Sequence, residues 1–88
     1  MSKRANKFYD YKYAISYINP GDPRSKAYYC RSYSNLSDAQ KYAESGFLNN
    51  PETNGTYVIS IIKQDVFNDI FFIRYDRATN TLRFEAIM

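Results

Sequence analysis

Apolar and polar residues alternate near the start of the chain. Between residues 8 and 18 the odd positions carry tyrosine or isoleucine, whereas charged and small side chains occupy most of the even positions. This two-residue period predicts a half-buried strand whose tyrosine face points inward. Two prolines and a glycine within residues 19–23 predict a turn. The tyrosine-rich segment 26–33 then predicts a second strand, which we expect to form a hairpin with the first.

The next segment has the apolar spacing of a helix. Asn35 is suited to the N-cap position, and Gly46 is suited to end the helix in a left-handed conformation. We therefore expect a helix from Leu36 to Ser45. The positions that share one helical face are Leu36, Ala39, Ala43 and Phe47, and the small residues among them allow close approach to a sheet.

Three further strands are predicted after the helix. Segment 56–64 is β-branched and apolar on both faces, which favours a central position in the sheet. Residues 65–69 are interpreted as a wide connection, 70–75 as the fourth strand and 81–88 as the fifth, after a hairpin turn. The sequence thus predicts an α+β fold with the element order β-β-α-β-β-β, in which one helix packs on one face of a five-stranded antiparallel sheet.

The chain length favours one domain. A length of 88 residues suits a single core, which we assign to residues 8–88, and the polar, basic segment 1–7 is expected to be a flexible arm. One helix covers only one face of such a sheet, so the other face must stay open, carry polar residues or meet a partner. We expect surplus aromatic residues such as Tyr29, Phe71 and Tyr75 on that outer side, where they would mark an interaction site.

The composition favours binding over catalysis. Sixteen residues are aromatic and ten of these are tyrosine, whereas the chain has no histidine, no tryptophan and a single cysteine. Tyrosine combines a rigid apolar ring with a polar tip and suits contact surfaces, and histidine is the usual general base and metal ligand. Cys30 is interpreted as a small buried hydrophobe, and Asp65, Asp69 and Asp76 as solvated turn residues rather than magnesium ligands. We expect no enzyme activity, no metal and no cofactor.

Charge and hydropathy indicate which partners and which cellular compartment to expect. The formal net charge of +3 is a mild bias towards polyanions or acidic protein surfaces. No stretch approaches the roughly 20 apolar residues needed to cross a bilayer, and no apolar segment follows the basic start as in a secretory signal. A lone cysteine forms no disulfide within the chain, which favours a reducing compartment. We expect a cytoplasmic protein without a membrane partner.

Two binding sites are considered. For a protein partner, tyrosine anchors and arginine contacts are expected, because both residue types are enriched at the energetic centres of interfaces. These residues are Tyr28, Tyr29, Arg31, Tyr33, Arg74 and Arg77. The alternative is direct RNA or DNA binding by an aromatic and basic sheet face. Its basic residues are Lys3, Arg4, Lys7, Lys63 and Arg83. Pairing of open faces in a homo-oligomer is a third possibility, so both a monomer and a homodimer remain open.

Residues 33–43, Tyr-Ser-Asn-Leu-Ser-Asp-Ala-Gln-Lys-Tyr-Ala, followed by Gly-Thr-Tyr-Val at 55–58, carry a resemblance. This layout resembles small phage-encoded proteins, including a ββαβββ anti-CRISPR of the type I-F inhibitor group. The resemblance implies a stoichiometric inhibitor in the cytoplasm of an infected host. It would dock on a host protein or ribonucleoprotein complex and block a guide or target site. Such proteins are commonly acidic DNA mimics, whereas this chain is basic, which favours contact with an acidic protein patch or with bound nucleic acid. The matching positions are structural, so no functional residue is carried over.

Overall fold

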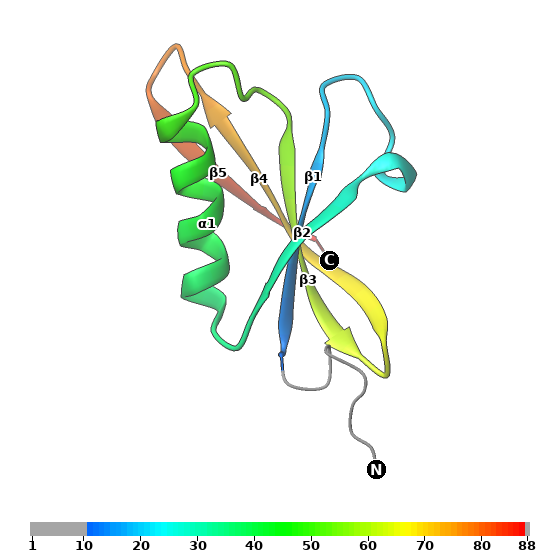
Figure 1. Cartoon of the computed structure of the whole chain (residues 1–88). Coiled ribbons are helices and arrows are strands. Elements are labelled where there is room, and N and C mark those ends of the chain that lie inside the picture. Colours follow the sequence, from blue (N-terminus) through cyan, green and yellow to red (C-terminus); the bar gives the residue numbers. More distant parts are fainter. Residues whose placement is uncertain (1–10, 88) are drawn as a thin grey trace.

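The computed structural model describes residues 11–87, which form one antiparallel sheet with a helix packed against it. The strand order is β2-β1-β3-β4-β5, and α1 packs along one face of the strongly twisted sheet (Figure 1). The strands are β1 Tyr13–Ile18, β2 Tyr28–Tyr33, β3 Thr56–Lys63, β4 Val66–Asp76 and β5 Thr81–Ala86, with α1 at Leu36–Asn49 and a short 3-10 turn, η2, at Arg24–Lys26. The predicted fold class and the predicted β-β-α-β-β-β order are confirmed.

The first strand is more deeply placed than its pattern predicts. β1 lies between β2 and β3, and all five residues from Ala14 to Ile18 are buried. Tyr17 does face the helix as expected, but Ser16 on the opposite side is buried as well, so the prediction of a half-buried strand is wrong. The predicted residues 8–10 of this strand, like the arm at 1–7, lie outside the described residues. The central position predicted for β3 is confirmed.

The core between helix and sheet uses small residues on the helix and large ones on the strands. Ala39 and Ala43 are fully buried, and they let α1 approach the sheet closely. Phe47 fills the space beyond them and contacts the rings of Tyr57 and Tyr75, with centroids 5.2 and 5.7 Å away. The remaining members of the cluster are Ile15, Tyr17, Ile59 and Ile73.

The helix does not end at Ser45, with Gly46 as the left-handed residue after it, as predicted, but runs on to Asn49. A β-carbon at position 46 would collide with the phenol ring of Tyr57. The glycine therefore permits the close approach of α1 to β3 and is not the left-handed end of the helix.

The connection between β3 and β4 is a tight hairpin. Gln64 and Asp65 form a two-residue turn, and both have positive φ, 50° and 64°. This conformation is typical of the type I′ turn, whose twist matches that of the flanking strands. The predicted wide connection at 65–69 is therefore wrong, and β4 begins at Val66.

The face of the sheet away from the helix is covered at its centre by its own side chains. Ala14, Val58 and Ser60 on this face are fully buried. Arg24 reaches across to Asp69 on β4, donating from Nε to Oδ2 at 2.7 Å and from Nη2 to Oδ1 at 2.8 Å. The hydroxyl of Ser60 donates to Asp69 Oδ1 at 2.7 Å. The centre of this face thus carries polar residues, which is one of the three alternatives considered for it.

The expected outer aromatic residues divide between the two faces. Tyr29 does lie on the outer face, where it pairs with Ser16 and contacts the ring of Phe67 at 6.2 Å between centroids. Phe71 and Tyr75 instead pack against the helix-side core. Their expected placement is wrong because β4 carries its odd-numbered residues from 71 to 75 on the same face as Tyr57 and Ile59.

Candidate binding site at the edge strand β2

β2 is an edge strand that displays two consecutive tyrosines. Tyr28 pairs with Tyr17 on the helix side, whereas Tyr29 pairs with Ser16 on the other side, so the two rings point to opposite faces. Their exposed fractions are 53% and 41%. Arg31 is also exposed, and its guanidinium lies over the ring of Tyr33, 5.7 Å from the centroid. Three of the four predicted β2 residues are therefore exposed together, and Tyr33 is partly buried.

A bulge at Cys30 shapes this edge. The register shifts so that Ser16 opposes Tyr29 while Ile15 opposes Arg31, which leaves Cys30 as the extra residue. The thiol packs against the helix-side core and donates weakly to the carbonyl of Tyr28, with Sγ and O separated by 3.8 Å. Burial raises the pKa of Cys30, so the group is a neutral thiol at neutral pH. This environment suits a packing role and disfavours nucleophilic chemistry.

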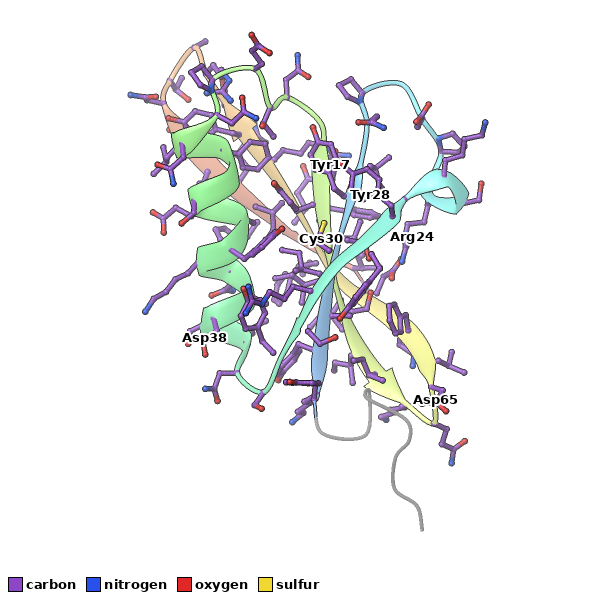
Figure 2. The ribbon with its side chains drawn as sticks, viewed as in Figure 1. Tyr17, Arg24, Tyr28, Cys30, Asp38 and Asp65 are labelled. Atoms are coloured by element: carbon purple, nitrogen blue, oxygen red, sulfur yellow. The ribbon has the colours of Figure 1, made fainter. Side chains whose placement is uncertain are left out.

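Beside β2 lies a cavity of about 380 Å³ lined by four phenol rings, which we call the four-tyrosine pocket. The rings come from four different elements: Tyr17 of β1, Tyr28 of β2, Tyr42 of α1 and Tyr57 of β3. Figure 2 shows Tyr17, Tyr28 and Cys30 on the neighbouring strands β1 and β2, with Arg24 on the side away from α1. The remaining lining consists of Cys30 and of the loop residues Asn50, Glu52 and Thr53.

Three of the four phenols of this pocket have a raised pKa, namely those of Tyr28, Tyr42 and Tyr57. Burial, reinforced by the neighbouring thiol and phenols, raises the pKa of Tyr57 to about 12. Burial also raises the pKa of Tyr28 and of Tyr42. The hydroxyl of Tyr17 accepts a hydrogen bond from the buried N–H of Gly55 at 2.8 Å and so ties the loop before β3 to β1.

The two remaining residues of the predicted protein-binding set lie elsewhere. Two strands separate β2 from β4, which carries Arg74 on the outer face, paired with Glu85. Arg77, in the turn after β4, donates to the carbonyl of Phe47 at 3.4 Å, and also to those of Asn50 and Thr53 at 3.3 and 2.5 Å. Arg77 therefore caps the C-terminal end of α1 and the loop that follows it, and it does not lie at the β2 edge.

The basic residues predicted for nucleic-acid binding are also spread out. Arg83 on β5 is exposed and lies directly opposite Arg74, so these two cations share the outer face. Lys63 pairs with Val66 at the far end of β4 and does not join them. Lys3, Arg4 and Lys7 lie outside the described residues.

Sequence reasoning missed Tyr42 and Glu52 of the pocket and the ion pair of Arg24 with Asp69. These partners are distant in sequence, and no local pattern signals their contact; Arg24 and Asp69 are 45 positions apart. Of the three aspartates considered for magnesium, Asp69 is engaged in this ion pair. Asp76 accepts hydrogen bonds from the backbone of its own turn. Within residues 11–87, no group of three or more acidic or cysteine side chains could hold a metal ion.

No helix in the described part of the chain is long and apolar enough to cross a membrane. Comparison with protein-family models, with curated proteins and with solved structures finds no match for this chain.

Proposed function

We propose that the protein is a non-catalytic binder that docks on a protein partner through the first half of β2. The observation that carries this proposal is the pair Tyr28 and Tyr29, half-exposed on opposite sides of an edge strand and followed closely by the exposed Arg31. Exposed rings of this kind gain binding free energy when a partner buries them, and a guanidinium pairs with carboxylates or phosphates. An edge strand also offers backbone donors and acceptors to a partner.

The resemblance to small phage inhibitors supplies the role that we propose for this docking. In that role the protein occupies a surface of a host defence or nucleic-acid-processing complex in the cytoplasm and blocks it sterically. Its basic charge favours an acidic protein patch as the target. Steric occlusion needs a contact surface and no catalytic group, which agrees with a neutral, partly buried Cys30 thiol.

The experiment is a phage plating assay on bacteria that carry a panel of CRISPR–Cas systems, each programmed against the phage. Expression of the wild-type protein is expected to restore plaques on at least one strain. The double variant Tyr29→Ala, Arg31→Ala should lose this protection while its circular dichroism spectrum is unchanged. The matched control is Lys41→Ala, Leu48→Ala, which removes one exposed cation and one exposed apolar side chain from α1. Full protection by the folded β2 variant would contradict the site, and no protection on any strain would contradict the inhibitor role.

Direct nucleic-acid binding is the second candidate, because Arg74 and Arg83 face each other on the outer side of β4 and β5. Like charges directly opposite on two strands repel, and a bound phosphate would relieve this repulsion. A gel-shift titration at two salt concentrations should then show salt-sensitive binding, weakened by Arg83→Ala. Binding unaffected by that variant, or no shift at high micromolar protein, would exclude this face.

A further inference from the structure

The rings that line the four-tyrosine pocket pack against one another at steep angles and not in a parallel stack. Tyr17 and Tyr57 meet at 60° with centroids 4.8 Å apart, and Tyr42 and Tyr57 meet at 87° with centroids 6.0 Å apart. Tyr28 is inclined at 60° to Tyr17, with centroids 5.8 Å apart. Because neighbouring rings are steeply inclined, they do not form the parallel slot that a flat base or dye needs. Aromatic rings set at steep angles around a hollow are instead suited to a compact, rounded group.

The charge of the pocket is opposite to that of the chain. The chain is basic overall, but none of the basic residues between positions 11 and 87 lines this pocket, and its one acidic lining residue is Glu52. Asn50 and Thr53 beside it add oxygen acceptors. Arg77 is not a lining residue, but its guanidinium donates to the backbone carbonyls of Asn50 and Thr53 in the same loop. Among the described residues, the pocket lining therefore offers aromatic rings and oxygen atoms and no cation, although Arg31 lies near enough to Tyr42 to oppose the rise in its pKa.

We propose that the four-tyrosine pocket binds an organic cation, namely a quaternary or methylated ammonium group, between its phenol rings and the carboxylate of Glu52. The faces of aromatic rings carry partial negative charge, so a cation within about 6 Å of several ring centroids is attracted to all of them. A volume of about 380 Å³ lies in the lower part of the range of ligand pockets, roughly 300–1,000 Å³. Such a volume leaves room for a headgroup but not for a large cofactor.

The neutral phenols support this assignment. Burial and the mutual repulsion of the ring oxygens disfavour any phenolate here, as the pKa of about 12 at Tyr57 shows. A negatively charged ligand would meet the same cost, whereas a bound cation would lower that pKa. Cation binding is therefore expected to ease the ionisation of Tyr57, which gives a readout besides affinity.

The experiment is a titration of the purified protein with choline, followed by nuclear magnetic resonance of the tyrosine rings. We expect saturable binding with a Kd on the order of millimolar, as suits a ligand of a few heavy atoms. The matched ligand is the neutral carbon isostere, in which a tert-butyl group replaces the trimethylammonium group. Equal affinity for the isostere would overturn the proposal, because shape alone would then explain the binding.

Protein variants locate the site. Tyr28→Ala should weaken choline binding about tenfold, whereas Tyr28→Phe, which keeps the ring, should retain it. The matched control is Tyr29→Ala, one residue away on the opposite face of β2. Glu52→Gln should weaken binding without affecting the fold, because Glu52 is exposed. Equal loss with Tyr28→Ala and Tyr29→Ala would overturn the assignment to this pocket.

A peptide that carries trimethyllysine distinguishes the source of the headgroup. Tighter binding of this peptide than of choline assigns the pocket to a side chain of a partner protein, and tighter binding of choline assigns it to a small metabolite. Either result supports the shared ammonium chemistry, and failure of both ligands to bind contradicts it. These measurements use purified protein alone, so their outcome is independent of the proposed docking at Tyr29 and Arg31.

Discussion

The ion pair of Arg24 with Asp69 is predicted to be a main stabilising contact of the outer face. Arg24 precedes β2 and Asp69 lies on β4, so the contact spans the width of β1 and β3. Asp69 accepts two hydrogen bonds from the guanidinium, at 2.7 and 2.8 Å, and one from Ser60 at 2.7 Å. The substitution Asp69→Asn keeps the shape of the side chain, removes the charge and turns one acceptor into a donor that faces the guanidinium.

The free energy of unfolding that Asp69→Asn removes is expected to lie between the value for a buried ion pair and the value for an exposed one. Hydrogen bonds to charged groups contribute about 1.5–3 kcal/mol each, and exposed ion pairs about 0.2–1 kcal/mol. The side chains of Arg24 and Asp69 are 39% and 24% exposed, so solvent screens the pair in part. After this discount we expect Asp69→Asn to lower the free energy of unfolding by about 2 kcal/mol at neutral pH. For a domain of this size that loss corresponds to roughly 8–16 °C in Tm.

The pH dependence has a definite sign. The hydrogen bonds from Arg24, helped by Ser60, hold the pKa of Asp69 below its ordinary value of 3.8. The stabilisation is therefore fully present well above pH 3.8 and is lost as the pH falls through the lowered pKa of the folded state. The difference in stability between wild type and Asp69→Asn should shrink over the same interval.

Urea denaturation followed by circular dichroism, at neutral pH and at a series of acid values, measures this difference. The matched control is Glu85→Gln, which breaks an ion pair with Arg74 whose side chains are 49% and 43% exposed. Glu85→Gln should lower the free energy of unfolding by no more than about 0.5 kcal/mol. Equal small losses in the two variants, or a difference for Asp69→Asn that does not change in acid, would refute this account of the outer face.

Three further outcomes are expected of the helix-side core. Phe47→Ala should cost about 3–5 kcal/mol in urea denaturation, because the ring is fully buried against Tyr57 and Tyr75. Tyr17→Phe should cost about 1–3 kcal/mol, because it leaves the buried N–H of Gly55 without its acceptor. In an ultraviolet pH titration, the Tyr57 phenol should ionise near pH 12, and this ionisation step should be missing in Tyr57→Phe. The contribution of the neutral phenol to the free energy of unfolding should be full below the ordinary pKa of 10 and should be lost as the pH rises through about 12.

Local patterns were sufficient to predict the elements and their order. The start of α1 at Leu36 follows from the residues around it, and its buried face of Ala39, Ala43 and Phe47 follows from their spacing. The central place of β3 follows from apolar residues on both faces. These features depend on neighbours within a few positions, which is why the sequence alone predicts them.

Features that depend on distant neighbours escaped prediction. Gly46 has the residue type of a helix end, but it lies within α1, and the nearby ring of Tyr57 explains why a residue without a side chain occupies this position. The turn at Gln64 and Asp65 takes positive φ without glycine or asparagine, so the usual hairpin signal is missing. In both places tertiary packing overrides the local preference.

The position of the candidate sites follows from how the outer face is closed. Small residues such as Ala14 and Ser60 are fully buried at its centre, where Ser60 donates to the carboxylate that pairs with Arg24. A face closed in this way needs no second layer of helices, so a partner has little to gain by covering its centre. The exposed rings lie instead at the β2 edge, where Tyr28 borders the pocket and Tyr29 the outer face. If Asp69→Asn opens the outer face, it should create a new apolar contact surface there and leave choline binding at the pocket unchanged.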